Sequence, residues 1–219
     1  MSASAIELPL FPLNVVLFPG MVLPLHIFES RYRQMIAECR RQNKPFGIVL
    51  ARPESLPLQE EPYSVGTMAE IHDLHKLADG HYILMAYGTR RFRILSQHRL
   101  KPYLSGVVEV YGDVSEPEDT LLDLAKQAGG LFKSYLNMLL EAANEPEKDI
   151  HDSVPDDPEE LSHFIAYFLE VPNEQKQRFL ELTSTLQRLQ EVIAVLHREV
   201  PFMRQMLSSQ IDEDRSRLN

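Results

Sequence analysis

The chain has 219 residues, 44% of them apolar, which is enough for one large domain or two small ones with a real core. Its formal net charge of −10 argues against nucleic acid as a partner, because an acidic chain repels phosphate. Cys39 is the only cysteine, which excludes an internal disulfide and a multi-cysteine metal site and favours a reducing compartment. The start of the chain lacks the pattern of a signal peptide, so we expect a cytoplasmic protein with no membrane segment.

Charge is distributed unevenly along the chain. Residues 1–112 carry a net charge of +2, whereas residues 113–219 carry −12. The apolar pattern changes from strand-like to helix-like at the same place. We therefore predict a β domain over residues 1–113 and an α-helical bundle domain over residues 114–219.

The opening stretch is the most apolar part of the sequence. Residues 6–10 alternate as a half-buried strand does, and Pro19-Gly20 predicts a reversal of the chain. Residues 21–27 then predict a strand buried on both faces, with Pro24 at an edge or a bulge, because proline cannot donate to a sheet ladder. A helix is expected to begin near Glu29, where apolar residues recur at intervals of three and four.

The clearest hairpin lies in the middle of the chain. Asp79-Gly80 suits a tight turn and is flanked by the strand-like arms 65–77 and 81–95. Shorter strands are predicted at 46–51 and 104–111. About six short strands with one inserted helix are typical of a small, bent, barrel-like β module.

The second half of the chain has helical periodicity. Gly129-Gly130 interrupts one apolar stripe, and because each Gly costs about 1 kcal/mol relative to Ala in a helix, we expect a kink or a close helix contact there. Asp157 is a good N-cap for a further helix, which Pro172 ends. The last apolar residues, from Phe179 to Leu207, alternate steps of three and four, as supercoiled helices do. This seam could close a bundle within the chain or pair with another chain.

Four stretches occur in an order that is informative: residues 8–36 (LPLFPLNVV…QMI), 65–94 (VGTMAEIHD…RFRI), 103–110 (YLSGVVEV) and 157–200, which includes Glu174-Gln175-Lys176-Gln177. Together they resemble the N-terminal substrate-binding domain of the ATP-dependent Lon protease family. The resemblance implies an α+β fold, a PUA-like β pseudo-barrel with one inserted helix, followed by a C-terminal helical bundle ending in a long helix. It also implies polypeptide binding.

Lon proteases continue into an ATPase module and a Ser-Lys protease module, and this sequence shows neither. Residues 129–134, GGLFKS, have the end of a phosphate-binding loop but lack the Gly before Lys that the motif requires. The chain therefore resembles a stand-alone Lon substrate-binding-domain protein. We expect a non-catalytic binding module without a cofactor.

Other chemistry is weakly supported. His72, Asp73, His75 and His81 cluster around the predicted hairpin turn, but residues three apart on a strand point to opposite faces, so we expect no metal site there. Cys39 lies on the apolar stripe of its helix, where a buried structural thiol is expected. No serine sits in a G-x-S-x-G elbow, and an enzyme is therefore not expected.

The sequence has one basic cluster: Arg90, Arg91, Arg93, Arg99 and Lys101. PUA-like folds often bind RNA, so this cluster is the best basis for an RNA-binding hypothesis. Against it, Glu70 and Asp73 on the partner arm could pair with these arginines. The acidic second half also opposes the approach of RNA, and nucleic acid remains a minor alternative.

The main hypothesis is a module that recognises exposed apolar segments of polypeptides, or a protease or chaperone partner. It would use the β module and the groove where that module meets the helices. The candidate residues are Phe11, Phe18, Met21 and Phe28, expected in loops of the opening stretch, because Met and Phe adapt to varied partners. The alternative is an assembly or adaptor protein that forms homo-oligomers or docks a protease through its C-terminal helix.

Overall fold

The computed structural model describes residues 5–53, 61–142 and 154–217. It divides into two compact units. The first contains Met1–Asp113 together with Tyr167–Thr183, and the second contains Val114–Ala166 with Ser184–Asn219. This division differs from the predicted one in that residues 167–183 belong with the strands. Among the described helices, none has the length and apolar character needed to cross a membrane.

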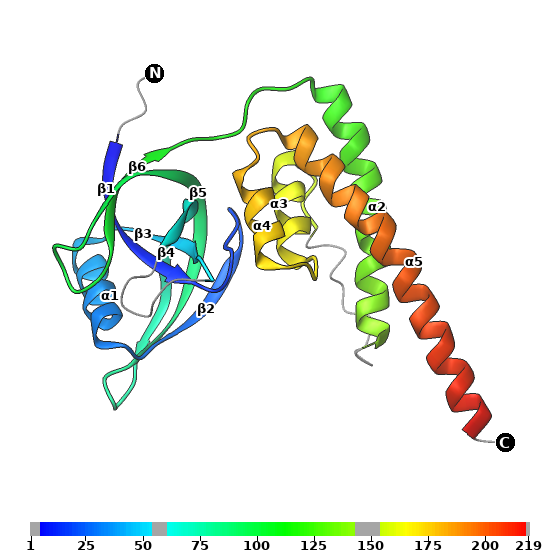
Figure 1. The fold of residues 1–219 in the computed structure, drawn as a ribbon, viewed down its shortest axis with the longest axis horizontal. Helices are drawn as coiled ribbons and strands as arrows, with labels where there is room; N and C mark the ends of the chain where they lie inside the picture. Colours follow the sequence, from blue (N-terminus) through cyan, green and yellow to red (C-terminus); the bar gives the residue numbers. More distant parts are fainter. Residues whose placement is uncertain (1–4, 54–60, 143–153, 218–219) are drawn as a thin grey trace. The chain divides into compact units, whose positions relative to one another are not determined.

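The first unit is built on a six-stranded sheet in the order β2-β5-β4-β3-β1-β6 (Figure 1). The strands are β1 Ala5–Leu13, β2 Val22–Ile27, β3 Phe46–Ala51, β4 Pro62–Lys76, β5 Tyr82–His98 and β6 Ser105–Val110. An additional pairing of β5 with β6 closes five strands into a pseudo-barrel and leaves β2 as an added strand at the side. The β4–β5 hairpin turns at Gly80, whose φ of 84° confirms the predicted tight turn.

β5 is the longest strand, and its two halves have different neighbours. Tyr82–Tyr87 pair with β2, whereas residues from Phe92 to His98 pair with β6. β4 pairs along both halves. The second half of β5 is therefore part of the closed barrel, and the first half lies in an open three-stranded sheet with β2 and β4.

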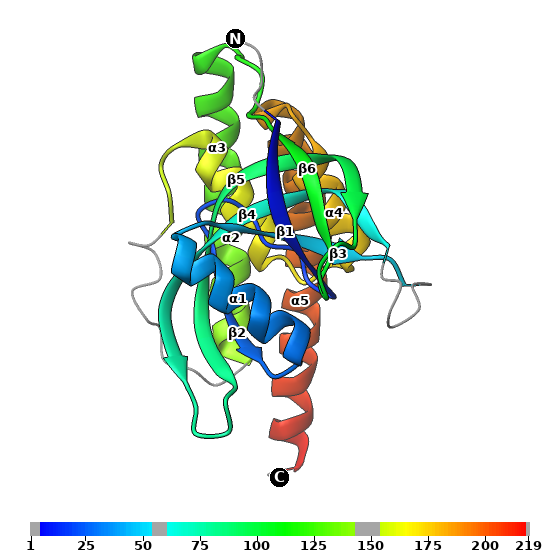
Figure 2. The ribbon, with the colours of Figure 1, turned by 90° about the vertical axis from the view of Figure 1, so that its left-hand side faces the viewer.

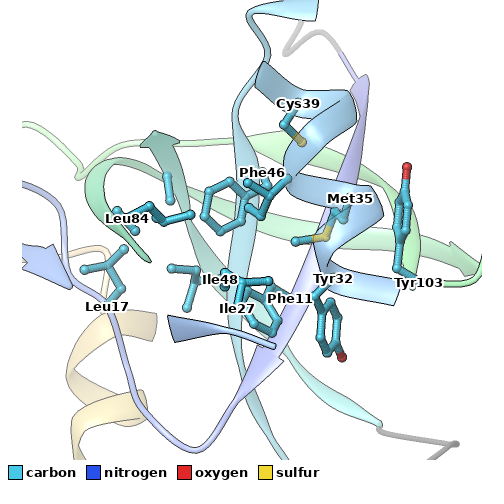
Figure 3. Packing of buried hydrophobic residues seen from close by; sticks show 13 residues of the cluster. Phe11, Leu17, Ile27, Tyr32, Met35, Cys39, Phe46, Ile48, Leu84 and Tyr103 are labelled. Carbon is cyan, nitrogen blue, oxygen red and sulfur yellow. The ribbon is translucent and has the colours of Figure 1, made fainter. Parts of the chain in front are cut away.

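α1 (Ser30–Gln42) packs against the core of this unit (Figure 2) and ends at Asn43, which has the left-handed conformation typical of a helix C-terminus. Figure 3 shows the cluster that the helix completes. The Phe11 and Tyr32 ring centroids lie 4.2 Å apart, so β1 and α1 meet through aromatic contact. The buried members of the cluster are Phe11, Leu17, Ile27, Tyr32, Met35, Ile36, Cys39, Phe46, Ile48, Ala69, Leu84, Ala86 and Tyr103.

The barrel closes around Phe92, and two glycines make room for its ring. A Cβ placed at Gly47 would lie 2.6 Å from Phe92 Cζ, and one at Gly66 would lie 2.8 Å from the same atom. Both distances are far below van der Waals contact. A residue larger than glycine at either position would therefore have to displace the ring that fills the barrel.

α4 (Asn173–Glu181) follows Pro172 and is fastened to the sheet by side chains that donate to backbone carbonyls. Asn173 Nδ2 donates to Asn14 O (2.9 Å), and Gln177 Nε2 donates to Val65 O (3.1 Å). The side chain of Asn173 therefore binds the loop that follows β1 and does not cap α4. These bonds explain why a helix from the C-terminal half belongs to the first unit.

Arg91 makes the strongest attachment of this segment. Its guanidinium is 2% exposed, donates to Leu180 O (3.0 Å) and Leu182 O, and pairs with the Asp113 carboxylate. The prediction that Glu70 and Asp73 pair with the arginines is therefore wrong for Arg91. A buried guanidinium is stable only when its donors are all matched, and here the end of α4 and Asp113 supply acceptors.

The second unit consists of α2 (Glu118–Ala142), most of α3 (Pro158–Phe168) and α5 (Thr185–Arg217), of which α2 and α5 pack together. α2 is continuous through Gly129-Gly130. A Cβ at Gly130 would meet no atom within 4 Å, and one at Gly129 would lie 3.9 Å from Leu161 Cδ2 of α3, an ordinary van der Waals distance. Neither glycine is therefore needed for a close helix contact, and the predicted kink stays a prediction. Asp157 caps α3 as predicted, because its carboxylate accepts from the Glu160 amide (2.9 Å).

The apolar seam from Phe179 to Leu207 predicts a single last helix, and this is wrong. The seam is divided between two helices, because α4 ends at Glu181 and α5 begins at Thr185. Ser184 caps α5 by accepting from Gln187 N (2.9 Å), and it donates to the Glu116 carboxylate (2.6 Å). This is a capping-box spacing that the sequence analysis missed. The seam residues Leu189, Ile193, Leu196 and Val200 are buried within this unit.

We predict that Arg91→Ala lowers the free energy of unfolding by about 3–5 kcal/mol, because it removes a buried guanidinium that pairs with the Asp113 carboxylate and donates to the Leu180 and Leu182 carbonyls. Urea denaturation followed by circular dichroism measures this loss. Arg93→Ala is the matched control, since the exposed Arg93 guanidinium only stacks over Tyr111, 5.2 Å from the ring centroid. It should cost less than about 1 kcal/mol. Equal losses in the two variants would contradict the prediction.

Candidate functional site

The outward face of the open three-stranded sheet carries a group of exposed apolar side chains. Residues that pair directly across strands share a face. The rows are Val22–Tyr87–Glu70, Pro24–Met85–His72 and His26–Ile83–His75. Phe28 continues the face beyond β2, because its ring lies 5.9 Å from the His26 ring. We call Val22, Pro24, Phe28, Ile83, Met85 and Tyr87 the apolar surface.

The prediction that residues 21–27 form a strand buried on both faces is wrong. Burial alternates along β2, and its outward residues are exposed. The alternate residues Leu84 and Ala86 of β5 are completely buried in the core, whereas Ile83, Met85 and Tyr87 are 37–41% exposed. In these two strands, therefore, a run of apolar residues has one face in the core and one in solvent.

β2 is an edge strand, as Pro24 predicted. Two features partly block the addition of another strand at this edge. Pro24 has no N–H to offer an added strand. The Tyr167 hydroxyl donates to Val22 O (3.1 Å), which shows that this carbonyl points away from β5. Phe168 stacks edge-on against Tyr167 at 5.1 Å and is 42% exposed. The face of the sheet is thus more accessible to a partner than the edge is.

The four residues predicted to bind apolar segments are placed differently by the fold. Phe11 belongs to β1 and Phe18 to the following loop, and both are buried, so neither can touch a partner. The Thr67 hydroxyl donates to Leu17 O (2.6 Å), which holds that loop inward. Met21 is half-buried against the core. Only Phe28, 57% exposed, lies on the apolar surface.

The residues that sequence reasoning missed are those of β5. Ile83, Met85 and Tyr87 alternate with buried residues, so their outward direction could be read from the period of two. The signal was hidden because the inward and outward residues are both apolar. Only the pairing of β5 with β2 and β4 brings them into one surface with Val22 and Pro24.

The histidines near the hairpin tip share a face, which corrects the prediction that His72 and His75 diverge. A register shift between them, with Asp73 at a φ of 45°, inserts an extra residue, so that His72 lies opposite Met85 and His75 opposite Ile83. Even so, no group of three or more His, Cys, Asp or Glu side chains in the described residues is arranged to hold a metal ion.

The basic cluster does not form one cationic patch. Arg91 is buried in its ion pair, and the Arg93 guanidinium stacks over Tyr111. Lys101 Nζ lies 2.6 Å from Glu38 Oε2 and 2.9 Å from the Tyr103 hydroxyl. Three of its five cations are therefore engaged inside the first unit, which weakens the RNA-binding hypothesis.

Lys101, Glu38 and Tyr103 form a closed network, because Tyr103 also donates to Glu38 Oε2 (2.8 Å). The hydrogen bond from Lys101 lowers the pKa of Glu38 to about 2, with further hydrogen bonds from Gln34 and Tyr103. Burial raises the pKa of the neighbouring Cys39 thiol to about 11. A thiol that stays protonated near neutrality is a poor nucleophile, as expected for a structural cysteine.

A hollow of about 580 Å³ lies between the end of α1 and β4. Arg40 and Lys44 line it on the helix side, and Glu70, His72 and Asp73 line it on the strand side. His72 also packs against Tyr87, at 5.8 Å between ring centroids, so the polar hollow adjoins the apolar surface. The site as a whole is an exposed apolar face with a polar border.

The family model of the ATP-dependent protease La (LON) substrate-binding domain matches residues 7–198. The chain is 32% identical over 212 residues to the Lon protease of Anaeromyxobacter dehalogenans, covering 94% of this chain and 24% of that protein. It is 31% identical to Lon protease 2 of Myxococcus xanthus, covering 94% and 25%. The chain thus spans about a quarter of the length of the curated relatives it matches.

Solved structures are similar over most of the chain. The crystal structure of a Lon N-terminal domain protein from Xanthomonas campestris has a TM-score of 0.63 and 27% identity, covering 86% of this chain and 98% of that one. The N-terminal domain of Mycobacterium avium complex Lon protease has a TM-score of 0.68 at 20% identity, covering 87% and 98%. These similarities confirm the predicted α+β fold with a β pseudo-barrel and C-terminal helices.

We predict that the carboxyl group of Glu38 titrates near pH 2. Because its folded pKa is depressed, the ion pair stabilises the protein above the pKa of the unfolded chain and ceases to do so as pH falls through about 2. The difference in unfolding free energy between wild type and Glu38→Gln should therefore shrink as the pH falls from the pKa of the unfolded chain towards 2.

Carboxyl-detected NMR titration measures this midpoint directly. Lys101→Met should raise the Glu38 midpoint, because it removes the main donor, whereas Lys44→Met is the control and should leave the midpoint in place. A Glu38 midpoint near 4.5 in the wild-type protein would contradict the assignment.

Proposed function

Because the chain belongs to the Lon substrate-binding domain family, we propose that it binds polypeptide segments with exposed apolar side chains and that it does so on the apolar surface. The main support for this proposal is that apolar residues of β2 and β5 lie side by side in cross-strand rows on the open sheet. Six apolar residues lie together on one face: two from β2, three from β5, and Phe28, which follows β2. All of them except Pro24 have side chains that are 37–57% exposed. Contiguous apolar surface of this kind marks interaction sites in folded proteins.

The character of the surface suits varied partners. Met85 at its centre is unbranched and polarisable, so it can adapt to side chains of different shape. Tyr87 and Phe28 offer rings at the two ends, which supply contact area at low entropic cost. Since Pro24 and Tyr167 restrict strand addition at the β2 edge, recognition depends on side chains more than on backbone hydrogen bonds.

The proposed role is that of a non-catalytic module in the cytoplasm, acting with a protease or chaperone that handles the captured segment. Support comes from the family, whose model describes substrate binding in an ATP-dependent protease. The shallow, open form of the surface also fits transient capture better than tight enclosure of a small molecule.

We predict that Ile83→Ser with Met85→Ser weakens the binding of an apolar peptide at least about tenfold, the change expected if the pair contributes about 1.4 kcal/mol. The probe is a blocked 12-residue peptide of Leu, Phe, Ser and Gln labelled with tetramethylrhodamine, and fluorescence anisotropy measures its Kd. Both side chains are exposed, so the fold should be retained, as the thermal unfolding midpoint would show.

Leu100→Ser is the matched control, because Leu100 is 86% exposed on the same unit but lies away from the apolar surface. It should leave the Kd unchanged. Equal weakening by Leu100→Ser would mean that the peptide binds non-specifically, and unchanged binding by the double variant would place the site elsewhere.

A second candidate is self-association through α5. Its supporting observation is Phe202, which is 59% exposed on this helix just after Pro201. Leu189, Ile193, Leu196 and Val200 of the seam are buried, so they are not available for a second chain. Any contact between copies would have to use the part of α5 that begins near Phe202.

If α5 drives assembly, sedimentation equilibrium should give a multiple of the 25.2 kDa chain mass, and Phe202→Glu should reduce it to one chain. A charge placed in an apolar contact between copies would disfavour it. Truncation at Glu199 should have the same effect. A single-chain mass for the intact protein at micromolar concentration removes this candidate.

A further inference from the structure

Histidines are concentrated around the apolar surface. The chain has eight histidines, and four of them lie on or beside this face: His26, His72, His75 and His81. The His26 and His81 ring centroids are 5.3 Å apart, and Phe28 lies 5.9 Å from the first and 6.5 Å from the second. These imidazoles are therefore part of the surface that an apolar segment would cover.

We infer that these four histidines make the capture of apolar segments dependent on pH, with binding when the imidazoles are neutral and release when they gain protons. The inference rests on the proposed function and adds its regulation. A neutral imidazole packs as an aromatic ring beside Phe28 and Tyr87. An imidazolium under an apolar segment would lose its hydration without gaining a partner from that segment.

The position of each histidine on the surface decides how much it contributes to the pH dependence of binding. His26 lies directly beside Ile83 and His72 directly beside Met85, so an occupant that covers these two apolar residues would also reach both imidazoles. His75 lies at the far end of the His26 row. His81 contacts the surface through the rings of His26 and Phe28. Two imidazolium ions at the distance of His26 and His81 would also repel one another.

Charged groups border the histidines, and their effects are limited. Glu70 lies 3.9 Å from His72 Nε2 and Asp79 lies 3.2 Å from His81 Nδ1, so each could pair with an imidazolium. Both carboxylates are more than half exposed, and such pairs contribute little in water. The other charged or titratable groups near these histidines are Arg33, Arg40, Lys44, Asp73, Lys76 and Tyr87.

The test uses the intact protein and the same uncharged, rhodamine-labelled peptide, so that only the protein titrates. Its Kd should be about tenfold larger at pH 5.5 than at pH 7.5, the scale expected for desolvating a charged group on binding. By linkage, peptide binding must also expel protons between the two pH values, which calorimetry in buffers of different ionisation enthalpy detects. Circular dichroism at both pH values controls for unfolding.

The variant that tests the assignment replaces all four surface histidines: His26→Gln, His72→Gln, His75→Gln and His81→Gln. The ratio of the two Kd values should fall to about one, whatever the absolute affinity. The control replaces His98 and His197, which lie elsewhere, and should keep the full ratio. Loss of the ratio in this control variant would overturn the assignment.

The outcomes separate this inference from the proposed function. Equal binding of the wild-type protein at both pH values, or tighter binding at pH 5.5, overturns the inference and leaves the proposed function standing. Failure to bind the peptide at either pH overturns the proposed function itself. Weaker binding at pH 5.5 that persists in the four-histidine variant also overturns the inference.

Discussion

The sharing of one long strand between two sheets is the constraint on which the first unit depends. β5 pairs with β6 over its second half and with β2 over its first half, and β4 runs beside both. Closure uses the second half, where Phe92 fills the barrel against Gly47 and Gly66. The first half continues into an open three-stranded sheet. One face of that sheet covers the core, and the other is left as the apolar surface.

The segment 167–183 shows how a barrel can be completed from a distant part of the chain. Its attachments run from side chains to backbone carbonyls, with Asn173, Gln177 and Arg91 as donors. The bonds to Val65 O and Leu180 O are buried, so they give partners to carbonyls that water cannot reach. The Arg91–Asp113 pair adds a buried charge interaction. A cluster that looks like a nucleic-acid site in the sequence is therefore used, in part, to hold the fold together.

Several features could be predicted from the sequence because their causes are local. The hairpin at Asp79-Gly80 follows from the positive φ that glycine accepts, and the start of α3 follows from the capping carboxylate of Asp157. The edge position of β2 follows from Pro24, which cannot serve a central strand. Contacts between distant segments were harder to predict: the partner of Arg91 lies 22 residues away, and two of its acceptors lie about 90 residues away.

The sequence by itself determined most of the elements, the α+β class and the apolar character of the opening stretch, because these depend on local backbone preference and on periodicity. Only the tertiary structure decided which apolar residues face solvent. Phe18 and Met85 are equally apolar, yet the first is buried by its loop and the second lies on an uncovered face. Burial depends on strand pairing and on what packs over each face, which is a property of the folded chain and not of the residue.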